Sequence, residues 1–202
     1  MLTGKALRHS LEVIPPIRIA GVYWRVVTAS SLLGLVIGSG GQPTVTRLNP
    51  KLLRGGPGRV GGRYTPIGGP DTLYLASSER AANAEWEAGL SALFPNVHLP
   101  PKVVFSANIV LDRVLDLSAD PVRQALETNV AELSRPWKAR KRTATQELGF
   151  AVFNSGRFSA LRYRSTKAAP SYCMAIFPDR LESAENVSVL DPENLFKRGI
   201  TS

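Results

Sequence analysis

The sequence predicts a single α+β domain, and three observations lead to that fold class. The length of 202 residues suits one hydrophobic core. The composition, with 44% hydrophobic and 20% charged residues, is that of a globular protein. Short apolar runs of strand length are interspersed with segments of helical periodicity, and no internal repeat is evident. We therefore divide the chain into an N-terminal extension, residues 1–20, and one domain, residues 21–202.

The first half of this domain is predicted to hold two strands and one helix around a long loop. Residues 21–27 combine aromatic and β-branched side chains, as strands do. Residues 54–70 contain seven glycines and three prolines, which favours a loop whose backbone can approach a ligand. Residues 72–76 predict a short buried strand, and a serine-capped helix is expected to follow from residue 78 to about 93.

The second half is predicted to supply most of the remaining strands. Apolar runs within residues 103–117 predict one or two of them, and Asp120-Pro121 is typical of the start of a short helix. Residues 143–154 have helical spacing, whereas residues 159–164 and 172–177 are typical of strands. Strands are thus expected to form most of the core.

The charge and the cysteine count narrow the class of protein. A formal charge of +9 predicts attraction to anions, whether small phosphates, nucleic acid or an acidic protein. The single cysteine, Cys173, cannot form an internal disulfide and is expected to be a packed thiol, which suits a reducing compartment. Neither a secretory signal nor a membrane-length apolar run is evident, because the most apolar stretch spans only residues 26–38. A cytoplasmic protein without a metal centre is expected.

One carboxylate of the predicted helix occupies an unexpected face. The residues at i−4, i−3, i+4 and i+7 from Glu85 are Ala81, Ala82, Gly89 and Ala92, so Glu85 lies in the middle of a stripe of small residues. A carboxylate on an inward face needs a hydrogen-bond or charge partner. A salt bridge to an arginine and a ligand-binding role both satisfy that need, and the pattern alone leaves both open.

Several short motifs resemble the RES domain family in their order and spacing. They cover roughly residues 21–182, and they are residues 23–25 (Tyr-Trp-Arg), 61–64 (Gly-Gly-Arg-Tyr), 72–76 (Thr-Leu-Tyr-Leu-Ala), 84–85 (Ala-Glu), 114–117 (Val-Leu-Asp-Leu), 120–122 (Asp-Pro-Val), 145–146 (Thr-Gln), 162–165 (Arg-Tyr-Arg-Ser) and 174–177 (Met-Ala-Ile-Phe). One departure is that Arg164 precedes Ser165, where the family usually has a proline or a small residue. The segment after Ser165, residues 166–170, also matches the family weakly.

The resemblance implies a bacterial toxin of a toxin–antitoxin pair. Its fold is expected to be similar to ADP-ribosyltransferases, and its activity to be destruction of NAD by hydrolysis or phosphorolysis. NAD is then a substrate rather than a cofactor, which agrees with the lack of a GxGxxG fingerprint between a predicted strand and a predicted helix, and inorganic phosphate is a potential co-substrate. The implied partner is an antitoxin that blocks the active site and carries a helix-turn-helix part, so that DNA is contacted only indirectly. A homo-oligomer within that complex is left open.

The resemblance also implies roles for seven residues. A carboxylate can stabilise the oxocarbenium-like transition state of nicotinamide release, and arginines can bind the two phosphates through forked hydrogen bonds. The expected catalytic residues are Glu85, Arg25 and Ser165, and the expected NAD-binding residues are Arg63, Tyr64, Tyr74 and Gln146. For Arg25 and Arg63, a structural ion pair and a solvated loop position are the respective alternatives.

Two other functions are consistent with the sequence. Transfer of ADP-ribose to a macromolecule uses the same bond cleavage with a different acceptor. A basic nucleic-acid-binding module is the second, because residues 135–142 carry five cations with Trp137 among them, although such runs are usually solvated faces. Residues 1–20 and the tail after Glu182 are assigned packing or partner contacts only.

Overall fold

Two long antiparallel strands form the frame of the domain in the computed structural model, which describes residues 1–29, 31, 35–37, 43–45, 61–91, 99–137 and 142–190. The strands are β1 (Ile17–Thr28), β2 (Leu35–Ile37), β3 (Pro43–Val45), β4 (Leu73–Ala76), β5 (Lys102–Asp116), β6 (Ala160–Arg164), β7 (Tyr172–Ile176) and β8 (Asn186–Val189). The helices are α1 (Gly4–Val13), α3 (Glu79–Ser91), α4 (Asp120–Ala125), α5 (Val130–Leu133) and α6 (Ala144–Ser155), with a 3-10 turn η2 (Pro178–Arg180). The predicted α+β class is confirmed.

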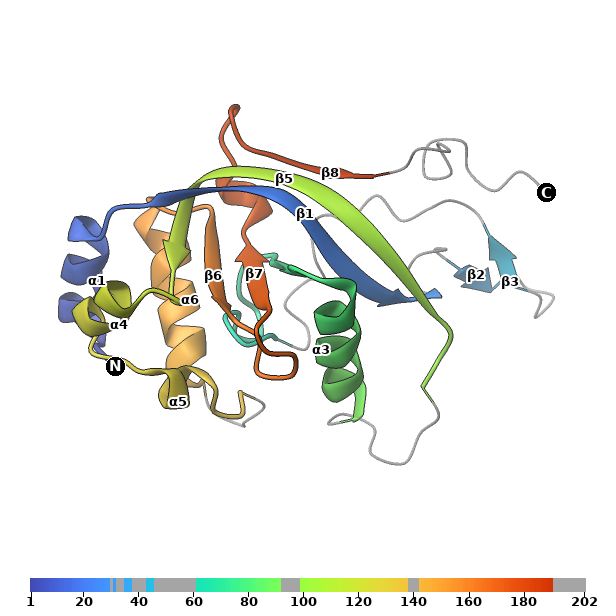
Figure 1. Ribbon diagram of the computed structural model, residues 1–202, viewed down its shortest axis with the longest axis horizontal. Coiled ribbons are helices and arrows are strands. Elements are labelled where there is room, and N and C mark those ends of the chain that lie inside the picture. Colours follow the sequence, from blue (N-terminus) through green and yellow to red (C-terminus); the bar gives the residue numbers. More distant parts are fainter. Residues whose placement is uncertain are drawn as a thin grey trace.

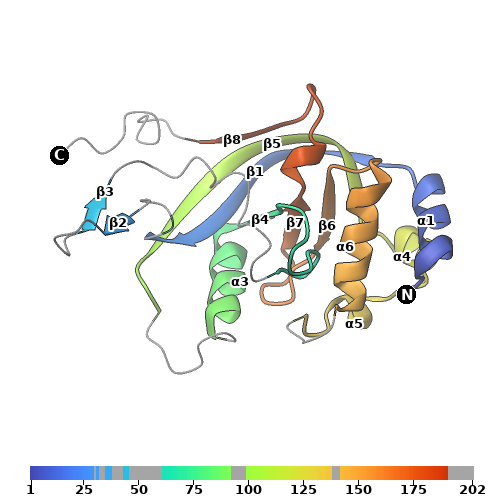
Figure 2. The same ribbon diagram turned by 180° about the vertical axis from the view of Figure 1, so that it is seen from behind.

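The main sheet closes on itself. Its strand order is β1-β4-β7-β6-β5-β8, and β1 also pairs with β5 along nearly its whole length. Among the strands that the structure describes, only the β5–β6 pair is parallel. In Figure 1 the β1–β5 pair arches over the shorter β6 and β7, and α3 and α6 lie to either side of these two strands in Figures 1 and 2. The closed arrangement brings the end of β1 next to β4 and α3.

The two faces of the sheet bury separate clusters of apolar side chains, because alternate residues of a strand point in opposite directions. One cluster consists of strand residues alone, including Leu75 and Ile109. The other joins the sheet to the helices and includes Leu11, Leu148 and Leu161. The continuous apolar run of β7 fits its position between β4 and β6, where both of its faces are covered.

Residues 1–20 contribute to the core. Leu7, Leu11 and Ile14 follow a helical spacing and are at most 4% exposed, and α1 packs against α6. The first strand begins at Ile17, four residues before the predicted strand at 21–27, because its pairing with β5 starts there. These residues therefore pack as part of the same fold.

The second half of the chain agrees with the prediction at β5 and contains elements that were not predicted. The segment 103–117 lies almost entirely in one strand, β5, which is one of the two predicted alternatives, because its polar residues Ser106 and Asn108 alternate with the buried Ala107 and stay paired with β1. The short α5 was not predicted, although Asn129 caps it by accepting a hydrogen bond from the amide of Glu132. Strand β8 was not predicted either. Much of the predicted loop at 54–70 and part of the basic run at 135–142 lie outside the described residues.

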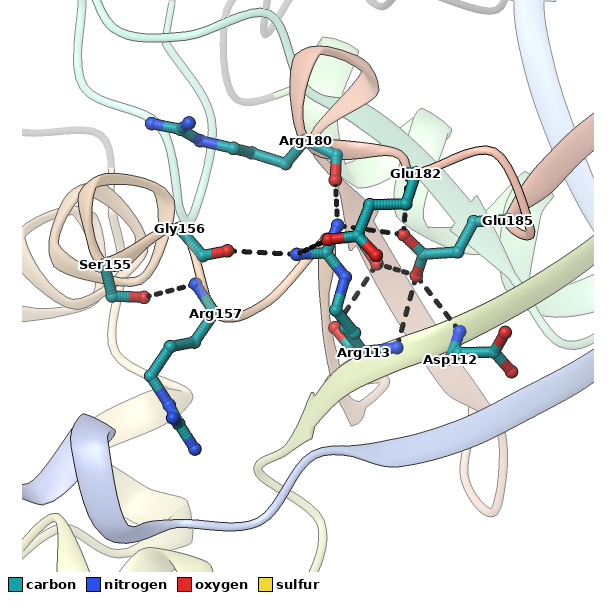
Figure 3. Close-up of polar contacts among 9 residues, drawn as sticks. Asp112, Arg113, Ser155, Gly156, Arg157, Arg180, Glu182 and Glu185 are labelled. Carbon is teal, nitrogen blue, oxygen red and sulfur yellow. Dashed lines mark hydrogen bonds and ion pairs between the residues drawn. The ribbon is translucent and has the colours of Figure 1, made fainter.

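The segment leading into β8 is held by one buried carboxylate, shown in Figure 3. The side chain of Glu185 is 1% exposed and accepts hydrogen bonds from the backbone amides of Asp112, Arg113 and Glu182 at 3.0–3.2 Å. Ser159 Oγ donates to it at 2.5 Å and Arg113 Nη2 at 3.1 Å. We name these five residues the Glu185 cluster. It ties β5, β6 and the start of β8 together.

Candidate active site

A cavity of about 660 Å³ opens between β1, the turn at residues 61–63, β4, α3 and the segment 134–137. This volume is within the range of roughly 300–1,000 Å³ that is typical of ligand sites. Its walls carry all three tryptophans of the chain, Trp24, Trp86 and Trp137. The other lining residues are Arg25, Val26, Gly61, Gly62, Arg63, Tyr74, Leu75, Ala76, Ala82, Glu85, Ala88, Gly89, Ser134, Pro136, Tyr163, Thr166, Lys167 and Cys173.

Glu85 reaches this cavity from the middle of α3. The helix buries Ala81 and Ala82 against the core, and Ala82, Ala88 and Gly89 line the cavity beside Glu85. The small side chains leave space next to a half-buried carboxylate, as the helical spacing predicts. Glu85 therefore lies on an inward face of α3, as expected.

Ser165 fixes one oxygen of this carboxylate. Ser165 Oγ donates to Glu85 Oε1 at 2.7 Å, and the amide of Thr166 donates to the same atom at 3.1 Å. The hydroxyl oxygen of Ser165 in turn accepts hydrogen bonds from the amides of Lys167 and Ala168, each at 3.1 Å, so its hydrogen is left for Glu85. Among the described residues, none donates to Glu85 Oε2. This second oxygen can accept a hydrogen bond from a ligand.

Arg25 supplies a partly buried positive charge to the same cavity. It lies on β1 between Trp24 and Val26, which also line the cavity. Burial lowers the pKa of Arg25 to about 10, so the guanidinium is still charged at neutral pH but is poorly hydrated. A poorly hydrated cation gains more free energy from contact with an anionic ligand than a fully hydrated cation does.

Arg63 lies on the cavity wall and is also tied to the protein. Its Nη1 donates to the carbonyl oxygens of Leu133 at 2.8 Å and of Arg135 at 3.0 Å. With only 9% of its surface exposed, it is not the solvated loop arginine that the sequence left as an alternative. Its contacts connect the turn that Gly62 and Thr65 close with the end of α5.

Tyr74 lines the cavity and supports the same turn. Its hydroxyl accepts a hydrogen bond from the amide of Tyr64 at 3.1 Å and lies 3.1 Å from Thr65 Oγ1. Gly62 allows this approach, because a Cβ at position 62 would collide with the Tyr74 hydroxyl. Burial raises the pKa of Tyr74, so its hydroxyl stays protonated at neutral pH.

Tyr64 and Gln146 are not among the described residues that line the cavity. Tyr64 is fully buried with its ring 4.7 Å from that of Tyr163, because the turn directs it toward the core. Gln146 is the third residue of a capping box with Thr143 at the start of α6, and its amide nitrogen donates to Gly62 O and Thr65 O. The expected direct contact of these two residues with NAD therefore has no support in this geometry.

Cys173 is a buried free thiol, as predicted, and it also lines the cavity. Burial, together with the negative charge of Glu85, raises its pKa to about 12. The thiol is therefore protonated at neutral pH and is a poor nucleophile. Within the part of the chain that the structure describes, no cluster of His, Cys, Asp and Glu could hold a metal ion, and no helix could cross a membrane.

Several of the cavity residues could not be selected from the sequence pattern. Trp24 belongs to a motif that was noted only for Arg25, Trp86 follows Glu85 directly, and Trp137 was interpreted as part of a charge run. Lys167 falls in the segment with the weakest family match. The signal that could have found Trp24 and Trp86 is their position next to Arg25 and Glu85 in the sequence.

The geometry defines a class of protein: an α+β domain whose cavity joins one held carboxylate, two arginines and three indole rings. The family model of the RES domain matches residues 44–197, and the chain belongs to that family. In fold the chain is similar to a chain in the crystal structure of the M. tuberculosis MbcT-MbcA toxin-antitoxin complex. The TM-score is 0.64 at 15% identity, over 93% of this chain and 91% of that one. No curated protein matches the chain by sequence.

Proposed function

We propose that this chain is an enzyme that cleaves the bond between nicotinamide and ribose in NAD. The observation that carries the proposal is the carboxylate of Glu85, held by Ser165 on the wall of a tryptophan-lined cavity. Membership of the RES domain family supports NAD cleavage as well, because the expected activity of that family is NAD destruction.

Glu85 would act on the charge that develops as the bond breaks. Nicotinamide leaves with the electron pair of the bond, so the ribose carbon C1′ becomes positively charged. A carboxylate with one oxygen held by Ser165 and Thr166 is already oriented to stabilise that charge or to bind a ribose hydroxyl. Water or a phosphate oxygen then bonds to C1′ and releases a proton.

The cavity walls suit the remaining parts of a dinucleotide. The indoles of Trp24, Trp86 and Trp137 offer stacking surfaces for the adenine and for the nicotinamide ring, which is cationic in NAD. Arg25 provides a charged, forked hydrogen-bond donor for the diphosphate. We also infer that the closed sheet is of the ADP-ribosyltransferase type, which superposition on such an enzyme would test.

We further propose that the chain is the toxin of a toxin–antitoxin pair. The similar fold found in the MbcT-MbcA complex supports this, as does the charge of +9, which favours an acidic partner. The antitoxin would cover the cavity and prevent NAD from entering. Expression of the chain alone should arrest growth while cellular NAD falls, and coexpression of the cognate antitoxin should prevent both effects.

The decisive biochemical experiment is product analysis by mass spectrometry. The purified chain, freed from any copurifying partner and refolded, is incubated with NAD in the presence and in the absence of phosphate. ADP-ribose indicates hydrolysis, phosphorylated ADP-ribose indicates phosphorolysis, and ADP-ribose attached to a protein or nucleic acid indicates transfer. If the folded chain leaves NAD intact under all these conditions, the proposed activity is wrong.

A further inference from the structure

The turn that forms one wall of the cavity is fixed from several sides. Gly62 and Thr65 hydrogen-bond to each other through their backbones, with Gly62 N donating to Thr65 O at 2.7 Å. Tyr74 supports the turn from the cavity side through the amide of Tyr64. On its other side the turn lies against α6, where a Cβ at Gly149 would collide with the carbonyl oxygen of Tyr64. The turn and α6 are therefore in intimate contact.

Gln146 is the side chain that links α6 to the turn. Its Nε2 donates to Gly62 O at 3.0 Å and to Thr65 O at 3.4 Å, while its Oε1 accepts from the amide of Thr143 at 3.0 Å. Gln146 is only 6% exposed. A buried amide that uses both ends in this way connects the first turn of α6 to the two residues that close the Gly62–Thr65 turn.

Arg63 connects the Gly62–Thr65 turn to the cavity wall that contains Pro136 and Trp137. It projects from the Gly62–Thr65 turn, and its Nη1 bonds to the carbonyl oxygens of Leu133 and Arg135. The residues that follow these carbonyls, Pro136 and Trp137, line the cavity. Gln146 therefore acts on the cavity through the turn and Arg63, without lying on the cavity wall.

We propose that Gln146 is a positioning residue, which holds the Gly62–Thr65 turn so that Arg63 and the segment with Trp137 keep their places around the substrate. The effect on NAD rests on the proposed function, whereas the effect on Trp137 does not. Since Glu85 and Ser165 lie on other elements, the loss of Gln146 should weaken substrate binding and leave the bond-breaking step nearly unchanged.

The test uses a pair of variants that separate positioning from helix capping. In Gln146→Glu the Oε1 atom can still accept from Thr143, but the donor to Gly62 and Thr65 is replaced by an oxygen. In Thr143→Val the hydroxyl part of the capping box is lost, and the Gln146 side chain keeps its partners. Gln146→Met, which adds no buried charge, replaces Gln146→Glu if that variant does not fold.

Two measurements are made on the folded variants. For NAD cleavage, the Gln146 variant should raise KM about tenfold with kcat changed less than about threefold, and Thr143→Val should leave KM unchanged. For Trp137, fluorescence quenching by acrylamide is measured without ligand in a background where Trp24 and Trp86 are phenylalanine. Quenching should rise in the Gln146 variant and not in Thr143→Val.

The outcomes keep the two proposals apart. If wild-type protein cleaves no NAD, the proposed function fails, and the quenching result alone decides the role of Gln146. If the Gln146 variant shows the quenching of wild type, or if Thr143→Val raises quenching equally, Gln146 only caps α6 and the inference is wrong.

Discussion

Glu85 and Glu185 are both carboxylates in the folded interior, but their surroundings differ. Glu185 is 1% exposed and receives hydrogen bonds from five groups, which use both of its oxygens. Glu85 is half-buried, and the two hydrogen bonds that it accepts converge on Oε1. The Glu185 cluster saturates its carboxylate, whereas the cavity holds one oxygen of Glu85 and leaves the other facing space.

This difference separates a structural role from a chemical one. A saturated carboxylate has no capacity left for a ligand, so its interactions stabilise the fold. A carboxylate that is oriented but not saturated can respond to a charge or hydroxyl that arrives with a substrate. Replacement of each glutamate by glutamine, which preserves shape, should therefore affect different properties of the protein.

The largest effect is expected for Glu85→Gln. Loss of the negative charge beside the breaking bond should reduce kcat for NAD cleavage by about 10³-fold. The free energy of unfolding should change by less than about 1 kcal/mol, because the replaced contacts are partly exposed and uncharged amide oxygen can still accept from Ser165. Steady-state kinetics and denaturant unfolding measure the two quantities, and a large loss of stability would contradict the comparison.

The second largest effect is expected for Glu185→Gln. The amide nitrogen would face groups that are themselves donors, and Arg113 would lose a buried counter-charge. The free energy of unfolding should fall by about 3 kcal/mol, while kcat per folded molecule should stay within about twofold of wild type. An unchanged midpoint of urea unfolding would show that the Glu185 cluster is not needed for stability.

A smaller effect is expected for Ser165→Ala. The carboxylate of Glu85 would keep its charge and the hydrogen bond from Thr166, but it would lose the hydroxyl that orients it. We expect kcat to fall about tenfold, with about 1 kcal/mol of stability lost because the amides of Lys167 and Ala168 lose their acceptor. A kcat equal to that of wild type would remove Ser165 from the mechanism.

The smallest effect is expected in mild acid. Burial raises the pKa of Glu185, but the hydrogen bonds from Ser159 and the Glu182 amide and the charge of Arg113 outweigh it, so the pKa lies below the ordinary 4.5. The stabilisation is therefore complete above about pH 4.5 and is lost as the pH falls through the folded-state pKa. The difference in unfolding free energy between wild type and Glu185→Gln should shrink on acidification, and a constant difference would be inconsistent with this pKa.

Local patterns in the sequence were enough to predict much of the fold. The strand at β4 and the helices at α3 and α6 follow from apolar periodicity, and the start of α3 follows from the serine before it. The closure of the sheet could not be predicted in this way, because the pairing of Ile17 with Val114 joins residues that no local pattern relates. Strand β8 could not be predicted for the same reason. Glu185 directly precedes it, but the partners of Glu185 at residues 112, 113 and 159 are far away in sequence.

The candidate site shows the same limit. Helical spacing alone placed Glu85 among small residues on an inward face, and that face lines the cavity. The spacing contained no information on partners, so a salt bridge to an arginine could not be distinguished from the hydrogen bond to Ser165. Gln146 and Tyr64 were grouped with the ligand contacts because a motif identifies residues that belong together, but it does not say which of them supports the others.

The role of Glu85 is tested most directly by the release of nicotinamide from NAD by wild type, Glu85→Gln and Glu185→Gln, each measured at a temperature where circular dichroism shows it folded. Wild type and Glu185→Gln should release nicotinamide at similar rates, and Glu85→Gln should release almost none. Release by folded Glu85→Gln at the wild-type rate would show that the carboxylate of Glu85 does not drive the cleavage.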